Sequence, residues 1–253
     1  MHRVFESAYA GALRVLTAGR GLAWQADEGT TFRIDPRCRW IRDPGYEAAV
    51  VSYLRGAVRP GDCCVDVGAH VGFYVLRMAK WSAPGGRVVA FEPNPAARAV
   101  LRSNVALNDL RSRVTIEALA AGAAAGTASL FHSGETSGLS RLEAPNPDSA
   151  SGRPVVVDVI ALDAYCADAG LRPDWILIDA EGAELSVLEG AAGLLRESPV
   201  QVIVEMHGSL WSDRTQTASR FESLLRLCGR RAVPLTGQRD LFADYGTIVL
   251  ARS

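Results

Sequence analysis

The sequence predicts an α/β fold, a doubly wound and mostly parallel sheet that ends in a C-terminal antiparallel edge hairpin. Three observations predict it. From residue 63 onward, short apolar runs alternate with segments of helical periodicity, as in parallel sheets covered on both faces. A turn with two glycines, Gly68 and Gly72, directly follows the first of these runs. The last two runs are joined by a polar loop alone, and such a short connection requires antiparallel strands.

Length and composition indicate a single compact domain. The chain has 253 residues, 48% of them hydrophobic, and no Pro/Ser-rich linker divides it. We expect a helix and short strands over residues 1–44, packed on one compact unit over residues 45–253. The N-terminal helix, residues 1–22, is expected to pack on this unit, and a position near the substrate entrance or at the contact of a homodimer is the alternative.

Charge, apolar runs and cysteines argue against several classes of protein. The formal net charge is −1 and no long basic run occurs, so we expect no nucleic acid held by phosphate contacts. No apolar run reaches the ~18 residues that cross a membrane, so we expect no membrane partner. The five cysteines are odd in number and lack CxxC spacing, which indicates ordinary thiols in the reducing cytoplasm.

The segment before the glycine turn contains short strands and one helix. Residues 22–42 include extended stretches, such as residues 31–34 before Asp35 and Pro36. Residues 45–57 carry an apolar stripe at helical spacing and predict a helix. Pro60 then predicts a turn that leads into the first strand of the parallel sheet.

Periodicity and boundary residues justify the alternating elements. Residues 63–67 form an apolar run with β-branched side chains, and residues 72–81 repeat apolar positions at helical spacing. Pro95 suits the first turn of the helix after the second strand. Residues 175–178 are apolar at consecutive positions, as in a strand buried on both faces. The predicted elements are strand 63–67, helix 72–81, strand 87–91, helix 95–108, strand 114–118, strand 171–178, helix 183–196, strand 200–205, helix 217–228 and strands 231–235 and 246–251.

One long segment, residues 132–154, interrupts this alternation with Ser, Gly, Pro and Asn. A loop of this length in a compact domain is usually functional or mobile. We therefore expect it to shape the substrate site.

The glycine turn predicts a nucleotide site with an unusual feature. Asp66, Gly68 and Gly72 form D-x-G-x-x-x-G, whereas a dinucleotide fingerprint has a further glycine where this chain has His70. That glycine lets the backbone approach a pyrophosphate. S-adenosylmethionine (SAM) has no phosphate, so its site does not require a glycine at the position of His70. Asp66 suits the ammonium group of SAM, either directly or through water.

A second acidic residue strengthens this interpretation. Glu92 ends the second strand about twenty residues beyond Gly72, where an acidic side chain accepts hydrogen bonds from ribose hydroxyls in such folds. The alternative is a purely structural turn beside a surface glutamate.

Four motifs in this order resemble the FkbM family of SAM-dependent methyltransferases. The motifs are residues 65–72 (VDVGAHVG), 91–95 (FEPNP), 104–108 (NVALN) and 178–184 (IDAEGAE). The resemblance covers roughly residues 46–207 and implies a class I, Rossmann-like methyltransferase fold. It also implies methyl transfer, usually to a hydroxyl of a natural product or sugar. The family more often has Asn at the position of His70.

The resemblance extends to further residues of a SAM site. Glu47 belongs to a Tyr-Glu pair that the family also has, and Ser137 belongs to a small-residue stretch, SGLS, at residues 137–140. With the motif residues, the expected cofactor-binding set is Glu47, Asp66, Gly68, His70, Gly72, Tyr74, Glu92, Asn94, Ser137 and Asp179. For Glu47 and Ser137, a helix-face glutamate and an ordinary loop are the alternatives.

The chemical end of the site is expected where the later strands finish. Asp179 and Glu181 follow the buried strand, and Glu205 and His207 end the next one, at the same crevice as the glycine turn. Methyl transfer to an alcohol requires alignment and removal of a proton, for which Asp179 or His207 is the expected base, with Glu205 beside them. The alternative is a divalent cation such as Mg²⁺, held by Asp179, Glu181, Glu205 and His207, that lowers the pKa of the hydroxyl.

We therefore expect a cytoplasmic SAM-dependent O-methyltransferase of natural product biosynthesis that acts on a small-molecule hydroxyl acceptor. Two alternatives stay open. An NAD-dependent oxidoreductase would need a close phosphate approach that His70 obstructs, and no Tyr-x-x-x-Lys pair occurs. A non-catalytic partner protein with the same fold is the other alternative.

Overall fold

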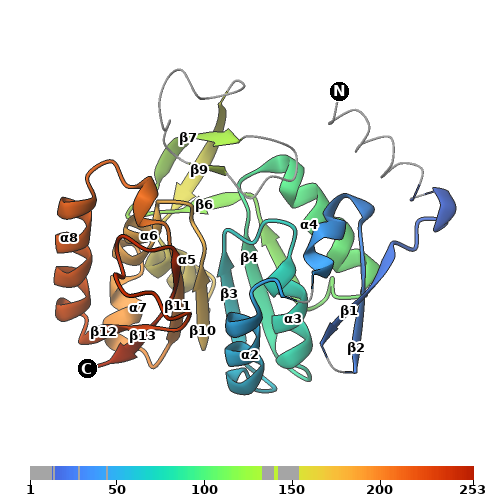
Figure 1. The fold of residues 1–253 in the computed structure, drawn as a ribbon, viewed down its shortest axis with the longest axis horizontal. Coiled ribbons are helices and arrows are strands. Elements are labelled where there is room, and N and C mark those ends of the chain that lie inside the picture. The colour runs from blue at the N-terminus through green and yellow to red at the C-terminus, as the bar shows by residue number, and fades with distance from the viewer. Residues whose placement is uncertain (1–12, 14, 28, 44, 133–139, 142–153) are drawn as a thin grey trace.

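A seven-stranded sheet lies at the centre of the structure. The structure is a computed structural model, and it describes residues 13, 15–27, 29–43, 45–132, 140–141 and 154–253. The strand order of the sheet is β12-β13-β11-β10-β3-β4-β5 (Figure 1). The strands are β3 (Cys63–Val67), β4 (Arg87–Phe91), β5 (Val114–Glu117), β10 (Trp175–Ile178), β11 (Gln201–Met206), β12 (Arg230–Pro234) and β13 (Gly246–Arg252). The five strands from β11 to β5 are parallel, and β13 is antiparallel to both β11 and β12. This confirms the predicted fold class.

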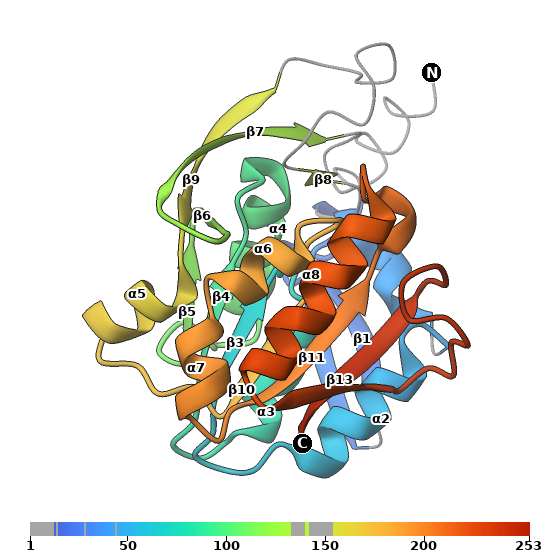
Figure 2. The same ribbon diagram turned by 90° about the vertical axis from the view of Figure 1, so that its left-hand side faces the viewer.

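Helices cover both faces of this sheet (Figures 1 and 2). The helices are α2 (Ala48–Ala57), α3 (Phe73–Trp81), α4 (Pro95–Leu107), α5 (Leu162–Asp168), α6 (Glu184–Glu189), α7 (Ala192–Glu197) and α8 (Arg214–Leu227). One apolar core joins α2, α3 and α4 to the sheet, and a second joins α5, α6, α7 and α8 to its other face. The central strands β3 and β10 are buried on both faces, which explains their consecutive apolar residues.

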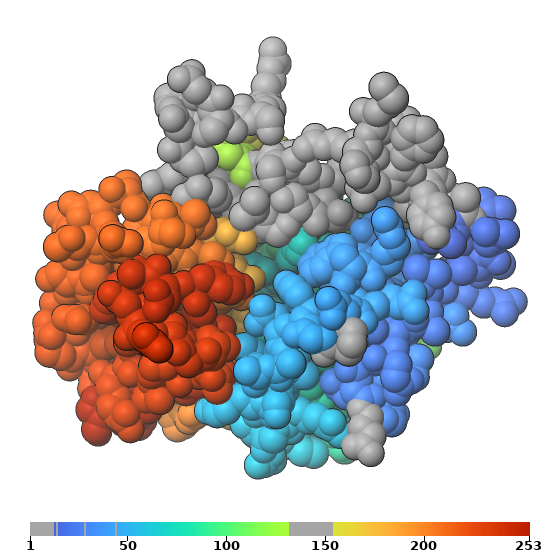
Figure 3. Space-filling view, viewed as in Figure 1, coloured from blue at the N-terminus to red at the C-terminus, as the bar shows by residue number. Residues whose placement is uncertain are grey.

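The N-terminal and C-terminal parts of the chain lie on opposite sides of the molecule (Figure 3). Strands β1 (Leu22–Asp27) and β2 (Thr30–Ile34) form an antiparallel hairpin, and a 3-10 helix, η1 (Pro36–Arg42), follows it. The expected extended stretches are therefore present, while η1 was not predicted. The predicted helix over residues 1–22 falls mainly outside the described residues. None of the helices in the described ranges is long and apolar enough to span a membrane.

The helix predicted over residues 183–196 is wrong as a single element. The structure divides it into α6 and α7 at Gly190, whose main chain packs so closely on Gly122 that a Cβ would lie 2.0 Å from the Gly122 oxygen. Asp163 of α5 accepts hydrogen bonds from the N–H groups of Gly193 and Leu194 at 2.7 and 2.9 Å. A carboxylate from another element thus caps the start of α7, which local periodicity does not reveal.

A second sheet occupies part of the segment that the alternation left unassigned. Its strands are β6 (Leu119–Ala121), β7 (Gly126–His132), β8 (Ser140–Arg141) and β9 (Val155–Ile160), in the order β6-β9-β7-β8 (Figure 2). Strands β7 and β9 bound the predicted long loop, of which residues 133–139 and 142–153 fall outside the described ranges. The sheet has a small apolar core of its own, Ala120, Leu130 and Val157, so its strands carry a weak hydrophobic signal.

A buried arginine ties the N-terminal hairpin to the helix that follows the glycine turn. The guanidinium of Arg77 in α3 lies 4.3 Å from the ring centre of Trp24 and 4.1 Å from that of Phe73. Its Nε is 3.3 Å from Oδ1 of Asp27, whose side chain is also buried. Because Phe73 begins α3, this contact supports the helix end next to the turn.

Replacing Arg77 with methionine should destabilise the protein by about 3 kcal/mol, because the buried Asp27 carboxylate loses its counter-ion. Urea unfolding measures this loss. The double variant Arg77→Met/Asp27→Asn removes the uncompensated charge and should recover at least about 1 kcal/mol. Equal stability of the single and double variants would show that packing on the two rings, rather than charge, sets the cost.

Candidate functional site

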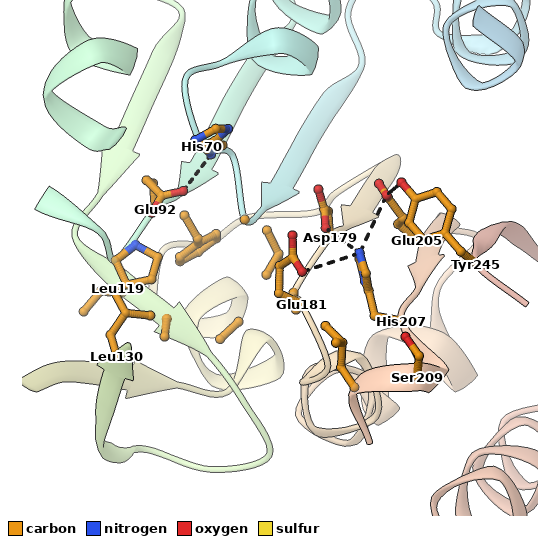
Figure 4. A pocket seen from close by; sticks show the side chains of 18 of the residues that line it. His70, Glu92, Leu119, Leu130, Asp179, Glu181, Glu205, His207, Ser209 and Tyr245 are labelled. Carbon is orange, nitrogen blue, oxygen red and sulfur yellow. Dashed lines mark hydrogen bonds and ion pairs between the residues drawn. The ribbon is translucent and has the colours of Figure 1, made fainter. Parts of the chain in front are cut away.

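A cavity of about 390 Å³ lies at the carboxyl ends of the parallel strands. Its walls come from the residues that end β3, β4, β10 and β11, from the second sheet and from two aromatic residues of the N-terminal segment, Trp40 and Tyr46. Figure 4 shows Glu92 at one end of this cavity and the side chain of His207 at the other. This is the crevice that the strand order of a doubly wound sheet predicts.

Glu92 and the glycine turn form one hydrogen-bonded unit. The Glu92 carboxylate accepts from the main-chain N–H groups of His70 and Asn94, both at 2.7 Å. The N–H groups of Gly68 and Ala69 donate to the carbonyl that ends β4, that of Phe91, at 3.0 and 3.1 Å. Glu92 is 4% exposed, and burial raises its pKa to about 7, although its two N–H donors act to lower it.

His70 contributes to this unit through its main chain. Its φ of 48° lies in the left-handed region, which turns its N–H toward Glu92. Its ring lies beside that of Trp40, with 5.7 Å between ring centres and 30° between planes, and both residues line the cavity. The turn therefore uses the left-handed backbone conformation of His70 to direct its N–H to Glu92, and a residue other than glycine occupies this position.

Gly68 joins the glycine turn to the chemical end of the cavity. Its φ is 83°, and a Cβ on it would lie 1.8 Å from the main-chain oxygen of Asp179. The N–H of Asp179 donates to the carbonyl of Val67 at 2.9 Å. Only a residue without Cβ allows the ends of β3 and β10 to approach this closely.

A fully buried carboxylate orients His207. Oε1 of Glu184, which is 0% exposed, lies 2.8 Å from Nδ1 of His207 and accepts from the N–H of Gly182 at 2.8 Å. Its Oε2 accepts from the indole N–H of Trp211 at 3.0 Å. With three partners, Glu184 holds the imidazole ring in one orientation.

The other ring nitrogen of His207 faces three carboxylates (Figure 4). Nε2 lies 3.9 Å from Oδ1 of Asp179, 3.7 Å from Oε2 of Glu181 and 3.7 Å from Oε1 of Glu205. Tyr245 donates its hydroxyl to Glu205. The structure therefore brings together the four residues that the sequence predicted at the chemical end.

Burial and crowding shift the pKa values of this cluster. Burial, and then the charge of Glu205, raise the pKa of Asp179 well above its usual value. Burial acts to lower the pKa of His207, but the Glu184 hydrogen bond and the charge of Asp179 outweigh it and raise that pKa to about 9. The crowding of carboxylates around one imidazole at this end of the cavity thus favours protonation of Asp179 and of His207.

The predicted cofactor-binding residues divide into two groups. Gly68, His70, Glu92 and Asp179 line the cavity. The others are not among its lining residues, namely Glu47, Asp66, Gly72, Tyr74 and Asn94, while Ser137 lies outside the described residues. Whether any of the ten contacts SAM stays a prediction.

The second group has structural partners close to the cavity. Glu47 accepts from the hydroxyl of Tyr74 at 3.2 Å, and Gly72 precedes the first turn of α3. Asn94 caps α4 by accepting from the N–H of Ala96 at 3.0 Å. Asp66 is buried within β3, where burial and the charge of Glu92 raise its pKa to about 8.

Sequence reasoning missed Glu184, Trp40 and Tyr245. Glu184 is the last residue of the 178–184 motif, so its position in that motif was an available signal. Trp40 and Tyr245 belong to η1 and to the loop between β12 and β13, where no local pattern marks them as site residues. Tyr46, noted beside Glu47, also lines the cavity.

The chain is similar to known methyltransferases. It matches the Methyltransferase FkbM domain over residues 66–232. It is 34% identical to methyltransferase sdnD of Sordaria araneosa over 168 residues, which cover 56% of this chain and 64% of sdnD. It is 45% identical to the 31-O-demethyl-FK506 methyltransferase FkbM of Streptomyces tacrolimicus over 64 residues, 24% of either chain. The chain thus matches less than two thirds of the length of these two relatives.

A solved structure shows the same fold. Methyltransferase FkbM from Methylobacillus flagellatus KT superposes with a TM-score of 0.54 at 18% identity, over 80% of this chain and 47% of that one. At this identity the likeness concerns the fold alone.

Gly68→Ala should destabilise the protein by about 3 kcal/mol or more, because its Cβ would displace the Asp179 carbonyl. Gly61→Ala is the matched control. Gly61 has a similar φ of 95° but no atom within 4 Å of a Cβ, so it should lose about 1 kcal/mol from backbone strain alone. Urea unfolding measures both. Equal losses would contradict the importance of the close approach to Asp179.

Proposed function

This chain belongs to the FkbM family of methyltransferases, and from that premise we propose that it transfers the methyl group of SAM to a hydroxyl of a natural product or sugar. The observation that carries the proposal is one cavity with two different ends. Glu92 and the glycine turn form one end, and the His207 cluster forms the other. Methyl transfer needs a cofactor site and a proton acceptor within a single pocket.

The residues at the Glu92 end suit SAM. Glu92 retains acceptor capacity for a ribose diol after its two main-chain contacts, because each carboxylate oxygen has two lone pairs. Apolar side chains beside it, including Phe91, Leu119 and Leu130, provide a slot for an adenine ring. The carboxylates toward the other end complement the positive charges of the sulfonium and the ammonium group.

The residues at the His207 end suit a hydroxyl acceptor. When bound, SAM supplies a methyl carbon that its sulfonium has already activated. The protein must then align the acceptor oxygen and receive its proton. Asp179, Glu205 and the imidazole of His207 provide the polar groups for both tasks, and Glu184 keeps the imidazole in place.

Family membership favours the methyltransferase over the two alternatives that the sequence left open. A methyltransferase family does not support the oxidoreductase, and the intact His207 cluster favours an enzyme over a non-catalytic partner. Cytoplasmic location, a small-molecule partner without nucleic acid or membrane, and a homodimer stay part of the proposal as predictions.

The affinity for SAM should fall as the pH is lowered through about 7, because the Glu92 carboxylate that receives the ribose hydroxyls becomes protonated. Between pH 8 and pH 6 its ionised fraction drops about tenfold, and the association constant should drop by a similar factor. Isothermal titration calorimetry across this range measures the effect.

Glu92→Ala should weaken SAM binding roughly ten- to hundredfold and remove this component of the pH dependence. Glu117→Ala is the control, because Glu117 ends the neighbouring strand β5 outside the cavity lining. Unchanged SAM affinity in Glu92→Ala, with an unchanged unfolding temperature, would refute the ribose role.

Turnover of methyl-labelled SAM with a library of hydroxyl-bearing acceptors tests the activity itself. We expect label on an acceptor oxygen, and a loss of at least about a hundredfold in kcat for His207→Gln with SAM binding retained. Mass spectrometry of the product locates the methyl group. Label on nitrogen or carbon, or full activity in His207→Gln, would contradict the proposal.

A further inference from the structure

We infer that Asp179, Glu205 and His207 bind a divalent metal ion at the acceptor end of the cavity. The site itself follows from the arrangement of the side chains. Its role, to hold and activate the acceptor hydroxyl, rests on the proposed methyl transfer.

The spacing of the donor atoms is that of ligands around a single ion. One donor atom from each of the three residues can be chosen so that all lie within 4.8 Å of one another. Nε2 of His207 is 3.9 Å from Oδ1 of Asp179 and 3.7 Å from Oε1 of Glu205. Ligands at about 2.1–2.5 Å from a shared ion stand roughly 3–5 Å apart, whether adjacent or opposite.

His207 points an unbonded nitrogen at these oxygens. Its side chain is 9% exposed, and its Nε2 makes no hydrogen bond within the described part of the chain, because all three carboxylates are beyond hydrogen-bond distance. Oδ1 of Asp179 is also buried and has no hydrogen-bond partner among the described residues. Nε2 of His207 and the buried Oδ1 of Asp179 therefore lie 3.9 Å apart without a hydrogen bond to each other.

Glu184 completes the arrangement as an outer partner. A metal-bound histidine usually gives its other ring N–H to a carboxylate, which sets the tautomer and the ring orientation. A metal ligand must be a neutral imidazole, and in the neutral ring the contact of 2.8 Å between Nδ1 and Glu184 keeps the proton on Nδ1 and turns the lone pair of Nε2 toward Asp179 and Glu205. The N–H groups of Gly182 and Trp211 hold Glu184 itself in place.

The donor set indicates which ions fit. Two carboxylates favour Mg²⁺ or Mn²⁺, while an imidazole nitrogen favours Mn²⁺ or a later first-row ion over Mg²⁺. Glu181, predicted as a fourth ligand, lies 3.7 Å from Nε2 but is not part of the compact group of three. We therefore expect a site that prefers Mn²⁺ to Mg²⁺ and leaves positions open for the acceptor.

The ion would act as a Lewis acid on the acceptor hydroxyl. Coordination lowers the pKa of the hydroxyl, and its proton passes to a carboxylate such as Glu181 and then to solvent. The oxygen forms a bond to the methyl carbon while the carbon–sulfur bond breaks, with its electron pair going to sulfur. The products are the methyl ether and S-adenosylhomocysteine, and no oxidant or reductant is required.

Titration of the EDTA-treated, dialysed chain of residues 1–253 with Mn²⁺ tests the site, followed by electron paramagnetic resonance and calorimetry. We expect one saturable ion per chain. Asp179→Asn, Glu205→Gln and His207→Gln should each weaken binding at least tenfold. Glu197→Gln, an exposed carboxylate on α7, is the matched control and should leave binding unchanged.

Glu184→Gln tests the outer partner. Because an amide would place a donor against the Trp211 indole N–H, the variant is made in a Trp211→Phe background and compared with Trp211→Phe alone. We expect Mn²⁺ binding to weaken ten- to hundredfold. Thermal unfolding and SAM binding of each variant show whether its fold is intact.

Absence of saturable Mn²⁺ binding, or equal binding by all variants, would overturn the inference. SAM binding and methyl transfer are measured on the same EDTA-treated protein. Full methyl transfer without an ion would refute the inferred role of the metal in activating the acceptor and leave the proposed function standing. Mn²⁺ binding without SAM binding would support the site and refute the proposed function.

Discussion

The main chain of Gly68 against the carbonyl of Asp179 is the contact on which the pocket depends. It brings the ends of β3 and β10 together, and the N–H of Asp179 donates a hydrogen bond to the carbonyl of Val67 between the same two strand ends. The next residues of the turn bond to Phe91 at the end of β4. Three strand ends are thereby fastened side by side, and any side chain at position 68 would separate them.

The two ends of the cavity, on either side of this contact, differ in their chemistry. Toward β4, the turn presents main-chain N–H groups, which hold Glu92 as a buried acceptor. Toward β10 and β11, the strands finish in carboxylates that surround one imidazole. A phosphate-free, positively charged cofactor is compatible with both ends, whereas an additional anion would meet unfavourable charge at the second.

Glu184 stabilises the second end of the cavity without being one of its lining residues. A buried carboxylate is costly unless its oxygens have partners, and here Gly182 and His207 contact one oxygen while Trp211 contacts the other. The same contacts determine which nitrogen of His207 faces the cavity. A residue that touches neither cavity nor solvent thus determines what the cavity can bind.

The sequence by itself determined the parallel sheet, the glycine turn, Glu92 and the residues at the ends of β10 and β11. These features are local, because an apolar run, a turn residue or an acid at a strand end can be recognised from a few neighbouring residues of the sequence. The parallel order of the strands then brings the ends together, so Asp179, Glu205 and His207 could be predicted as neighbours.

Only the tertiary structure decided what depends on contacts between distant segments. The break between α6 and α7 needs Asp163 from α5, and the second sheet has too small a core to mark its strands. Glu184 shows its role only when Trp211 and His207 fold against it. The sequence also did not reveal that His70 donates its main-chain N–H to Glu92. This contact depends on a φ of 48° at His70, a backbone conformation that packing sets and that leaves no pattern in the sequence.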